Sequence, residues 1–356
     1  MSDSSVITRE AIPVQEALMA AQLEVNPVSR TCYTLAGRLL SFESTDEWAA
    51  RVAETYLKGF QLKLSTGRLN RAADFNVRLL EGEPPPIPPA LQKFELPQGF
   101  CFTDGESYYL DIDDSRIAVG THASRQMSVW LGRTRHARHP VSLVNVMSSV
   151  LHIALRRCAL YDLHAAGVVE PASGAGVLFL GDSNSGKTSL TLRLTRSGWS
   201  YLSDDLLVFY EGAEHIEAQG LRRVFSVAAS NLVNCDLPRL EEALGVPAYA
   251  DPNKRRLEPS VIFPERFAEA CVPRVLYFAS ITGEKKSRME EVGQSDALIR
   301  LVKLCPWSSF DVMARQNLNV LSRLVRQVKA YNLFAGRDVV DDPACAAALL
   351  SAHVNA

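Results

Sequence analysis

The chain has 356 residues, of which 47% are hydrophobic and 22% are charged, ordinary usage for one large or two medium-sized globular domains. Its 38 basic and 40 acidic side chains leave a formal charge of −2, so no polyanion-binding surface and no nucleic-acid partner are expected. The seven cysteines are scattered without a Cys-x-x-Cys pair, which argues against a disulfide framework or a zinc site and favours a reducing cytoplasm.

The two kinds of segment that would direct a chain to a membrane are not expected here. The first five residues are polar and acidic, whereas a secretory signal begins with a basic and then an apolar stretch. The longest apolar zone, residues 141–163, is interrupted by Asn145, His152 and a pair of arginines, and therefore predicts a buried helix. We expect a cytoplasmic protein with no membrane partner.

Residues 1–140 predict an accessory domain of mixed α+β structure that recognises the acceptor. A short helix is expected within residues 14–23, a second helix begins near Thr45, and residues 33–42 have a strand pattern with a turn at Gly37. After a proline-rich connector, short strands separated by Asp-Gly and Asp-Asp turns predict a meander at residues 100–103, 108–112, 116–119 and 127–131.

A basic cluster at residues 133–139 precedes the second predicted domain. Such a cluster suits an acidic or phosphorylated partner, but a solvated loop is the more usual role of a short charge run. We place the domain boundary near residue 140, and expect a helix from Val141 and an α/β nucleotide-binding domain over residues 141–356.

Residues 181–188 read Gly-Asp-Ser-Asn-Ser-Gly-Lys-Thr and fit the phosphate-binding loop pattern G-x-x-x-x-G-K-[ST]. An apolar strand-like run at 177–180 precedes the loop and a helical pattern at 188–196 follows it, which is the context that the motif needs. In such a loop, backbone N–H groups surround phosphate oxygens, the lysine reaches the β- and γ-phosphates and the threonine ligates Mg²⁺. A nucleoside triphosphate and Mg²⁺ are therefore expected as cofactors, and on the interpretation of the protein as a kinase we take the nucleotide to be ATP. The expected nucleotide-binding residues are Gly181, Asp182, Ser183, Asn184, Ser185, Gly186, Lys187, Thr188 and Ser189.

Two adjacent carboxylates, Asp204 and Asp205, follow the loop beside an apolar strand pattern. One carboxylate can hold Mg²⁺, which prefers oxygen ligands, and the other can accept the proton of an attacking hydroxyl. The plainer interpretation is an Asp-Asp turn. His164 lies on the strand upstream of the loop, where a catalytic and a structural role are equally open.

A run of three cations, Lys254-Arg255-Arg256, follows an Asp-Pro turn. Such cations can stabilise charge on a phosphoryl group in transfer, with Arg255 and Arg256 as the candidates. A solvated basic turn is the alternative.

Together these residues resemble the C-terminal catalytic domain of the HPr serine kinase/phosphorylase family. The resemblance consists of the His164 strand, the phosphate loop, a short helix ending at Gly198 and the Ser203-Asp204-Asp205 element. It implies a fold like the nucleotide domain of phosphoenolpyruvate carboxykinase and a kinase of protein or peptide serine. It further implies that Lys187 binds phosphates, His164 assists, Asp204 is the base and Asp205 supports the metal together with Thr188.

The chain looks more like shorter relatives found with natural-product peptide gene clusters than like the bifunctional enzymes. Ser189 stands where the bifunctional enzymes carry an acidic residue. Two other functions stay open: a nucleotide-binding adaptor that transfers no phosphoryl group, and a kinase of a small hydroxyl-bearing metabolite. The expected partner is a protein or peptide with a serine hydroxyl, and a homo-oligomer is possible because the family tends to oligomerise.

Overall fold

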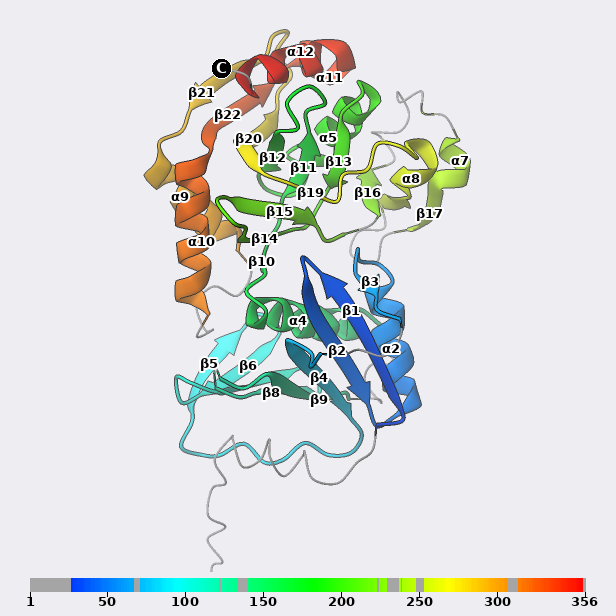
Figure 1. Ribbon diagram of the computed structural model, residues 1–356, viewed down its shortest axis with the longest axis vertical. Coiled ribbons are helices and arrows are strands. Elements are labelled where there is room, and N and C mark those ends of the chain that lie inside the picture. Colours follow the sequence, from blue (N-terminus) through cyan, green and yellow to red (C-terminus); the bar gives the residue numbers. More distant parts are fainter. Residues whose placement is uncertain are drawn as a thin grey trace, which may run out of the picture. The chain divides into compact units, whose positions relative to one another are not determined.

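The computed structural model describes residues 27–66, 71–121, 123–132, 140–222, 224–228, 237, 239–247, 253–305 and 313–354. The helix expected within residues 14–23 and the basic cluster at residues 133–139 lie outside these ranges. The chain forms two compact units (Figure 1), the first from Met1–Tyr56 and Lys63–Cys158, the second from Leu57–Leu62 and Ala159–Ala356. Within the described ranges, no helix is both long and apolar enough to cross a bilayer.

The first unit contains a nine-stranded sheet of order β3-β1-β2-β4-β9-β8-β7-β6-β5. Its strands are β1 (Ser29–Leu35), β2 (Arg38–Ser44), β3 (Lys63–Leu64), β4 (Phe75–Leu80), β5 (Gln92–Leu96), β6 (Gly99–Thr103), β7 (Tyr108–Ile112), β8 (Ser115–Val119) and β9 (Gln126–Trp130). From β5 to β9, each strand pairs antiparallel with its neighbour in the chain, which confirms the predicted meander.

Two helices, α2 (Glu47–Leu57) and α4 (Pro140–Arg157), accompany this sheet. α4 buries Val146 and Val150 and contacts β4, and Arg157 donates hydrogen bonds to the carbonyl oxygens of Gly120 and Thr121. These contacts join α4 to the first unit. The division of the chain therefore follows Cys158, whereas the sequence pattern placed it near residue 140.

The second unit contains three sheets. A six-stranded sheet has the order β13-β11-β12-β20-β22-β21, a four-stranded sheet the order β10-β14-β15-β19, and a three-stranded sheet the order β16-β18-β17. The strands are β10 (Tyr161–Leu163), β11 (Ala166–Val169), β12 (Gly176–Leu180), β13 (Ser200–Ser203), β14 (Leu207–Glu211), β15 (Ile216–Gly220), β16 (Phe225–Ala228), β17 (Leu244–Pro247), β18 (Lys254–Leu257), β19 (Ala270–Cys271), β20 (Pro273–Ile281), β21 (Arg288–Glu291) and β22 (Lys329–Ala335). The helices are α5 (Lys187–Arg196), α7 (Leu240–Ala243), α8 (Pro259–Ile262), α9 (Gln294–Leu304), α10 (Ala314–Gln327), α11 (Arg337–Asp341) and α12 (Pro343–Val354).

The six-stranded sheet is buried on both faces. Alternate side chains of a strand point to opposite sides, so each strand contributes to the apolar packing on both faces. On β12, Val177 and Phe179 pack into one apolar cluster with residues of α5, α11 and α12. Leu178 and Leu180 pack into a second cluster with residues of α9, α10 and the four-stranded sheet. β12 and β20 pair in parallel, so the loop at the carboxyl end of β12 starts from a rigid strand with partners on both sides.

Two neighbouring segments of chain pass between the four-stranded and the six-stranded sheet at the same level, in opposite directions. β10 continues into β11 through His164 and Ala165, while β13 continues into β14 through Asp204 to Leu206. The strands pair before and after the change, with Leu163 opposite Leu207 and Gly167 opposite Ser203. We call these two adjacent connections, residues 164–165 and 204–206, the shared crossing. It brings His164 and the carboxylate pair together.

Candidate functional site

The loop between β12 and α5 has three residues in the left-handed backbone region and leads directly into a helix. Gly181 and Gly186 have φ of 140° and 103°, and Asn184 has φ of 68°, a region that side chains other than asparagine or aspartate seldom adopt. Gly186 is the N-cap of α5, whose first turn presents free N–H groups. Because those groups and the helix dipole attract anions, the loop is suited to phosphate. The local prediction of strand, glycine turn and helix is thus confirmed.

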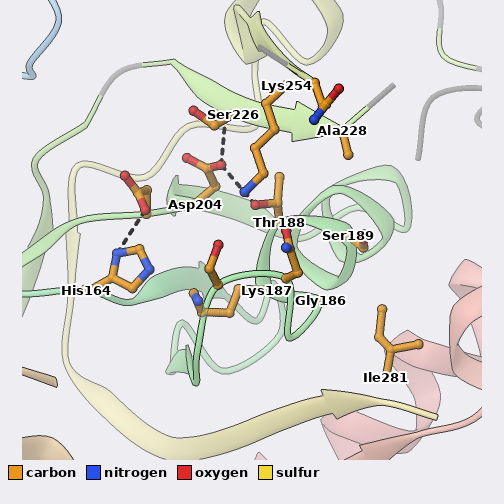
Figure 2. Close-up of a pocket in the computed structure, with 14 residues that line it drawn as sticks. His164, Gly186, Lys187, Thr188, Ser189, Asp204, Ser226, Ala228, Lys254 and Ile281 are labelled. Atoms are coloured by element: carbon orange, nitrogen blue, oxygen red, sulfur yellow. Dashed lines mark hydrogen bonds and ion pairs between the residues drawn. The ribbon is translucent and has the colours of Figure 1, made fainter. Parts of the chain in front are cut away.

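A cavity of about 420 Å³ lies against this loop (Figure 2). It is lined by His164, Ser183, Asn184, Gly186, Lys187, Thr188, Ser189, Asp204, Asp205, Ser226, Ala228, Asn253, Lys254 and Ile281. The lining comes from the loop, the shared crossing, the β16–β18 pair and the end of β20. Segments far apart in the chain therefore converge on one cavity.

Asp204 is 2% exposed and faces the phosphate loop. Its Oδ2 accepts hydrogen bonds from the Thr188 hydroxyl at 3.1 Å and from the Ser226 backbone N–H at 3.0 Å. Its Oδ1 is buried without a hydrogen-bond partner. A buried carboxylate oxygen left without a donor has a large free-energy cost, so this atom is suited to a cation.

Asp205 points toward the other side of the crossing. Its Oδ1 lies 2.9 Å from His164 Nδ1, and its Oδ2 lies 2.9 Å from Nη1 of Arg222. Because a carboxylate only accepts hydrogen bonds, Nδ1 of His164 is the donor. Figure 2 shows the second ring nitrogen on the side away from this contact. In the neutral ring that nitrogen is an acceptor.

The surroundings drive the two carboxylates to different charge states. Burial, together with the neighbouring charge of Asp205, raises the pKa of Asp204 to about 7. Burial also raises the pKa of Asp205, but the hydrogen bond from His164 and the charge of Arg222 outweigh it and hold that pKa at about 2. Burial lowers the pKa of Lys187, although the charges of Asp205 and Asp204 oppose this shift.

The residues around the loop fit a nucleotide phosphate and a divalent cation. A Cβ atom at Gly181 would lie 2.8 Å from Oγ of Ser185, and one at Gly186 would lie 2.5 Å from the Ile281 side chain, so the loop leaves no room for side chains there. Ser185 Oγ is buried without a hydrogen-bond partner. Carboxylate and hydroxyl oxygens, as on Asp204 and Thr188, are the ligands that Mg²⁺ takes.

Lys187 turns back onto its own loop. Its Nζ donates to the carbonyl oxygens of Gly181 at 2.7 Å and Asp182 at 3.0 Å. Phosphate oxygens would compete with these carbonyl oxygens for the same ammonium group, so nucleotide binding is expected to draw Lys187 out of the loop.

The Lys254-Arg255-Arg256 run divides between the cavity and the strand surface. It forms β18, where neighbouring side chains point to opposite faces. Lys254 lines the cavity, and Figure 2 shows its side chain extending toward Asp204 and Thr188. Arg255 and Arg256 are not among the lining residues, and Arg255 donates to the carbonyl oxygen of Gly245. Of the three cations, Lys254 therefore lies at the cavity, whereas the sequence analysis favoured Arg255 and Arg256. Strand alternation accounts for Arg255 alone, because Arg256 lies on the same side of β18 as Lys254.

Three functional positions had no clear signal in the sequence. Arg222 contacts Asp205, Ser226 donates its backbone N–H to Asp204, and Ile281 covers Gly186. Each reaches the site through strand pairing or a long-range contact. No local motif in the sequence marks these individual residues.

Comparisons with known proteins give a partial likeness to a solved structure. No protein-family model matches the chain, and no curated protein matches it. Among solved structures, it is similar to the HPr(Ser) kinase/phosphatase from Coxiella burnetii, with 12% identity and a TM-score of 0.28. The likeness covers 54% of this chain and 89% of that one.

Proposed function

We propose that this protein is a Mg-ATP-dependent kinase that transfers the γ-phosphoryl group to a hydroxyl, of serine type, on a protein or peptide. The observation that carries the proposal is the joining of two pairs in one cavity: Thr188 with Asp204, and His164 with Asp205. The first pair suits a metal at the phosphate loop, and the second suits removal of a proton. Phosphoryl transfer to a hydroxyl needs both.

The loop and its neighbours bind and orient the nucleotide. Backbone N–H groups of the loop and Nζ of Lys187 hold the phosphates, and Thr188 and Asp204 hold Mg²⁺. The metal supplies neutralisation of charge on the phosphate oxygens when it is bound. This assignment gives Asp204 the metal and Asp205 the proton side, the reverse of what the family resemblance implied. Support comes from the Thr188 hydroxyl, which contacts Asp204.

The His164–Asp205 pair receives the proton of the acceptor hydroxyl. Asp205 holds the ring through Nδ1, so that Nε2 is the basic atom that faces away from the carboxylate. A fixed tautomer with an adjacent carboxylate is a recurrent arrangement for a general base. Lys254, which extends toward the metal side of the cavity, stabilises charge on the phosphoryl group in transfer.

The test is to incubate the protein with Mg-ATP and candidate peptides encoded by neighbouring genes, and to search by mass spectrometry for an added phosphate. The Lys187→Ala variant is the control and should bind ATP weakly and transfer nothing. His164→Gln should bind ATP as the parent does and transfer about 100-fold more slowly, the usual contribution of a general base.

Other outcomes separate the remaining functions. ATP binding without transfer to any peptide would favour a nucleotide-binding adaptor. Transfer to a small hydroxyl-bearing metabolite but to no peptide would favour a metabolite kinase. A cytoplasmic location and a homo-oligomer remain predictions that fractionation and light scattering would check.

A further inference from the structure

Arg222 forms one side of a clamp around Asp205. Its Nη1 lies 2.9 Å from Asp205 Oδ2, while the imidazole of His164 lies 2.9 Å from the other oxygen. Each carboxylate oxygen therefore has its own charged or polar partner. An aspartate held at both oxygens cannot turn about its last side-chain bond, so its direction toward His164 is fixed.

Asp205 needs these two contacts because a second carboxylate, that of Asp204, is next to it. Asp204 and Asp205 are consecutive, and neighbouring carboxylates repel one another in a site of low polarity. The Asp205 side chain is 25% exposed, so water could hydrate its carboxylate if the contacts with Arg222 and His164 were lost. Without Arg222, rotation of Asp205 toward solvent would relieve the repulsion and release His164.

Arg222 is itself fixed by the segment Leu57–Leu62. Phe60 pairs with Arg222 in an isolated antiparallel bridge, and the guanidinium lies 5.9 Å from the centre of the Phe60 ring. The carbonyl oxygen of Arg222 accepts hydrogen bonds from Gln61 Nε2 at 3.0 Å and from Ser203 Oγ at 3.2 Å. The backbone and the side chain of Arg222 are thus both held.

The same segment also holds the strand that carries the carboxylates. Gln61 Nε2 donates to the carbonyl oxygen of Leu202 at 3.0 Å, two residues before Asp204, and the Gln61 N–H donates to Leu221 at 2.8 Å. One glutamine side chain therefore joins the end of β13 to Arg222. This fixes the distance between the carboxylate pair and the arginine that orients its second member.

We infer that Arg222 is a positioning residue, fixed by Phe60 and Gln61, that holds Asp205 against His164 so that the imidazole is aligned for proton removal. The inference rests on the proposed function for its kinetic consequence. Its structural content, the direction of the Asp205 carboxylate, stands apart from any activity. Arg222 does not line the cavity, so nucleotide binding does not require it.

The test compares Arg222→Met, Arg222→Lys and the control Arg274→Met, whose arginine is exposed on β20. Crystal structures, the dissociation constant for Mg-ATP by calorimetry, and steady-state ADP release with water as acceptor are measured for each. Arg222→Met should bind Mg-ATP within about 3-fold of the parent and lose at least about 10-fold in kcat with KM for ATP unchanged, because a group that acts only on proton removal is missing. In its crystal structure, Asp205 should leave His164 while the Thr188–Asp204 contact stays.

Arg222→Lys keeps the charge and should restore part of the lost turnover, and Arg274→Met should match the parent. The inference is overturned if the Arg222→Met crystal structure keeps Asp205 within hydrogen-bond distance of His164 Nδ1, or if its turnover equals that of the parent. Should the parent bind no ATP and release no ADP, the proposed function fails, and the direction of Asp205 in the crystal structures still decides the role of Arg222.

Discussion

At the scale of single residues, the buried carboxylate of Asp204 reduces the stability of the folded protein. Its carboxylate is buried, and one oxygen has no hydrogen-bond partner. Such a group destabilises the fold when it is ionised and no cation is present. A buried charge that reduces stability is typical of a functional site, where the charge is needed for function.

Asp204→Asn tests this cost through pH. Because burial raises the pKa of Asp204 to about 7, the protonated group stabilises the fold most below the unfolded pKa of about 3.9. This contribution is lost as the pH rises through about 7. Asparagine does not titrate, so the free energy of unfolding of the variant relative to that of the parent should be about 1 to 3 kcal/mol higher at pH 8 than at pH 5. Thermal melting with EDTA present at both pH values measures the change, and an equal difference at pH 5 and pH 8 would contradict it.

Gly186→Ala tests the loop. The residue has φ of 103°, and a Cβ atom there would lie 2.5 Å from Ile281, so strain and a clash should cost about 1 to 3 kcal/mol and weaken ATP binding at least about 10-fold. Gly283→Ala is the matched control, because a Cβ atom there meets nothing within 4 Å. The double variant Gly186→Ala, Ile281→Ala should recover part of the binding. No recovery would assign the whole effect to the backbone.

At the scale of elements, the strand–loop–helix unit was predictable and its surroundings were not. A local apolar run, a glycine motif and a helical pattern occupy contiguous residues, so 177–196 could be assigned from the sequence. The run at 254–256 could not be oriented, because which side of β18 faces the cavity depends on its pairing with β16. Arg222 was missed for the same reason, since its contact with Asp205 spans β14 and β15.

Leu190→Ala tests the packing that holds α5 behind the loop. Leu190 is fully buried in the cluster that joins α5 to β12, β20 and α12. Its truncation should cost about 2 to 5 kcal/mol and, because the first turn of α5 holds the loop, should also weaken ATP binding. Leu318→Ala on α10, where the leucine is 45% exposed, should cost less than about 0.5 kcal/mol. Chemical denaturation measures both, and a loss of stability equal in the two variants would contradict the assignment.

At the scale of the whole molecule, the second unit is built from a discontinuous chain. Leu57–Leu62 belongs to it, although the residues on either side belong to the first unit. Composition and patterning indicated two domains but not this exchange, because nothing in residues 57–62 differs from an ordinary connection. The decisive contacts, from Gln61 to Leu202 and Arg222, span 141 and 161 residues of chain.

Gln61→Leu tests whether the segment Leu57–Leu62 contributes to the stability of the second unit. The variant leaves the carbonyl oxygens of Leu202 and Arg222 with one hydrogen bond fewer, which should cost about 1 to 3 kcal/mol. Hydrogen exchange should rise in peptides that cover residues 200–222. The exposed Gln98, replaced in the same way, should leave that exchange unchanged. Equal protection in the two variants would show that the segment is only an attached connection.

The place of Leu57–Leu62 in the chain also sets an order of events during synthesis. A ribosome releases Gln61 long before Leu202 and Arg222, the residues whose carbonyl oxygens it binds. At about 5 to 20 residues per second, the segment would wait for several seconds or more, with the first unit already complete at Cys158. The orientation of Asp205 is therefore among the later events of folding, and a chain interrupted before Arg222 would carry the Gly181–Thr188 loop without the arginine contact that holds Asp205.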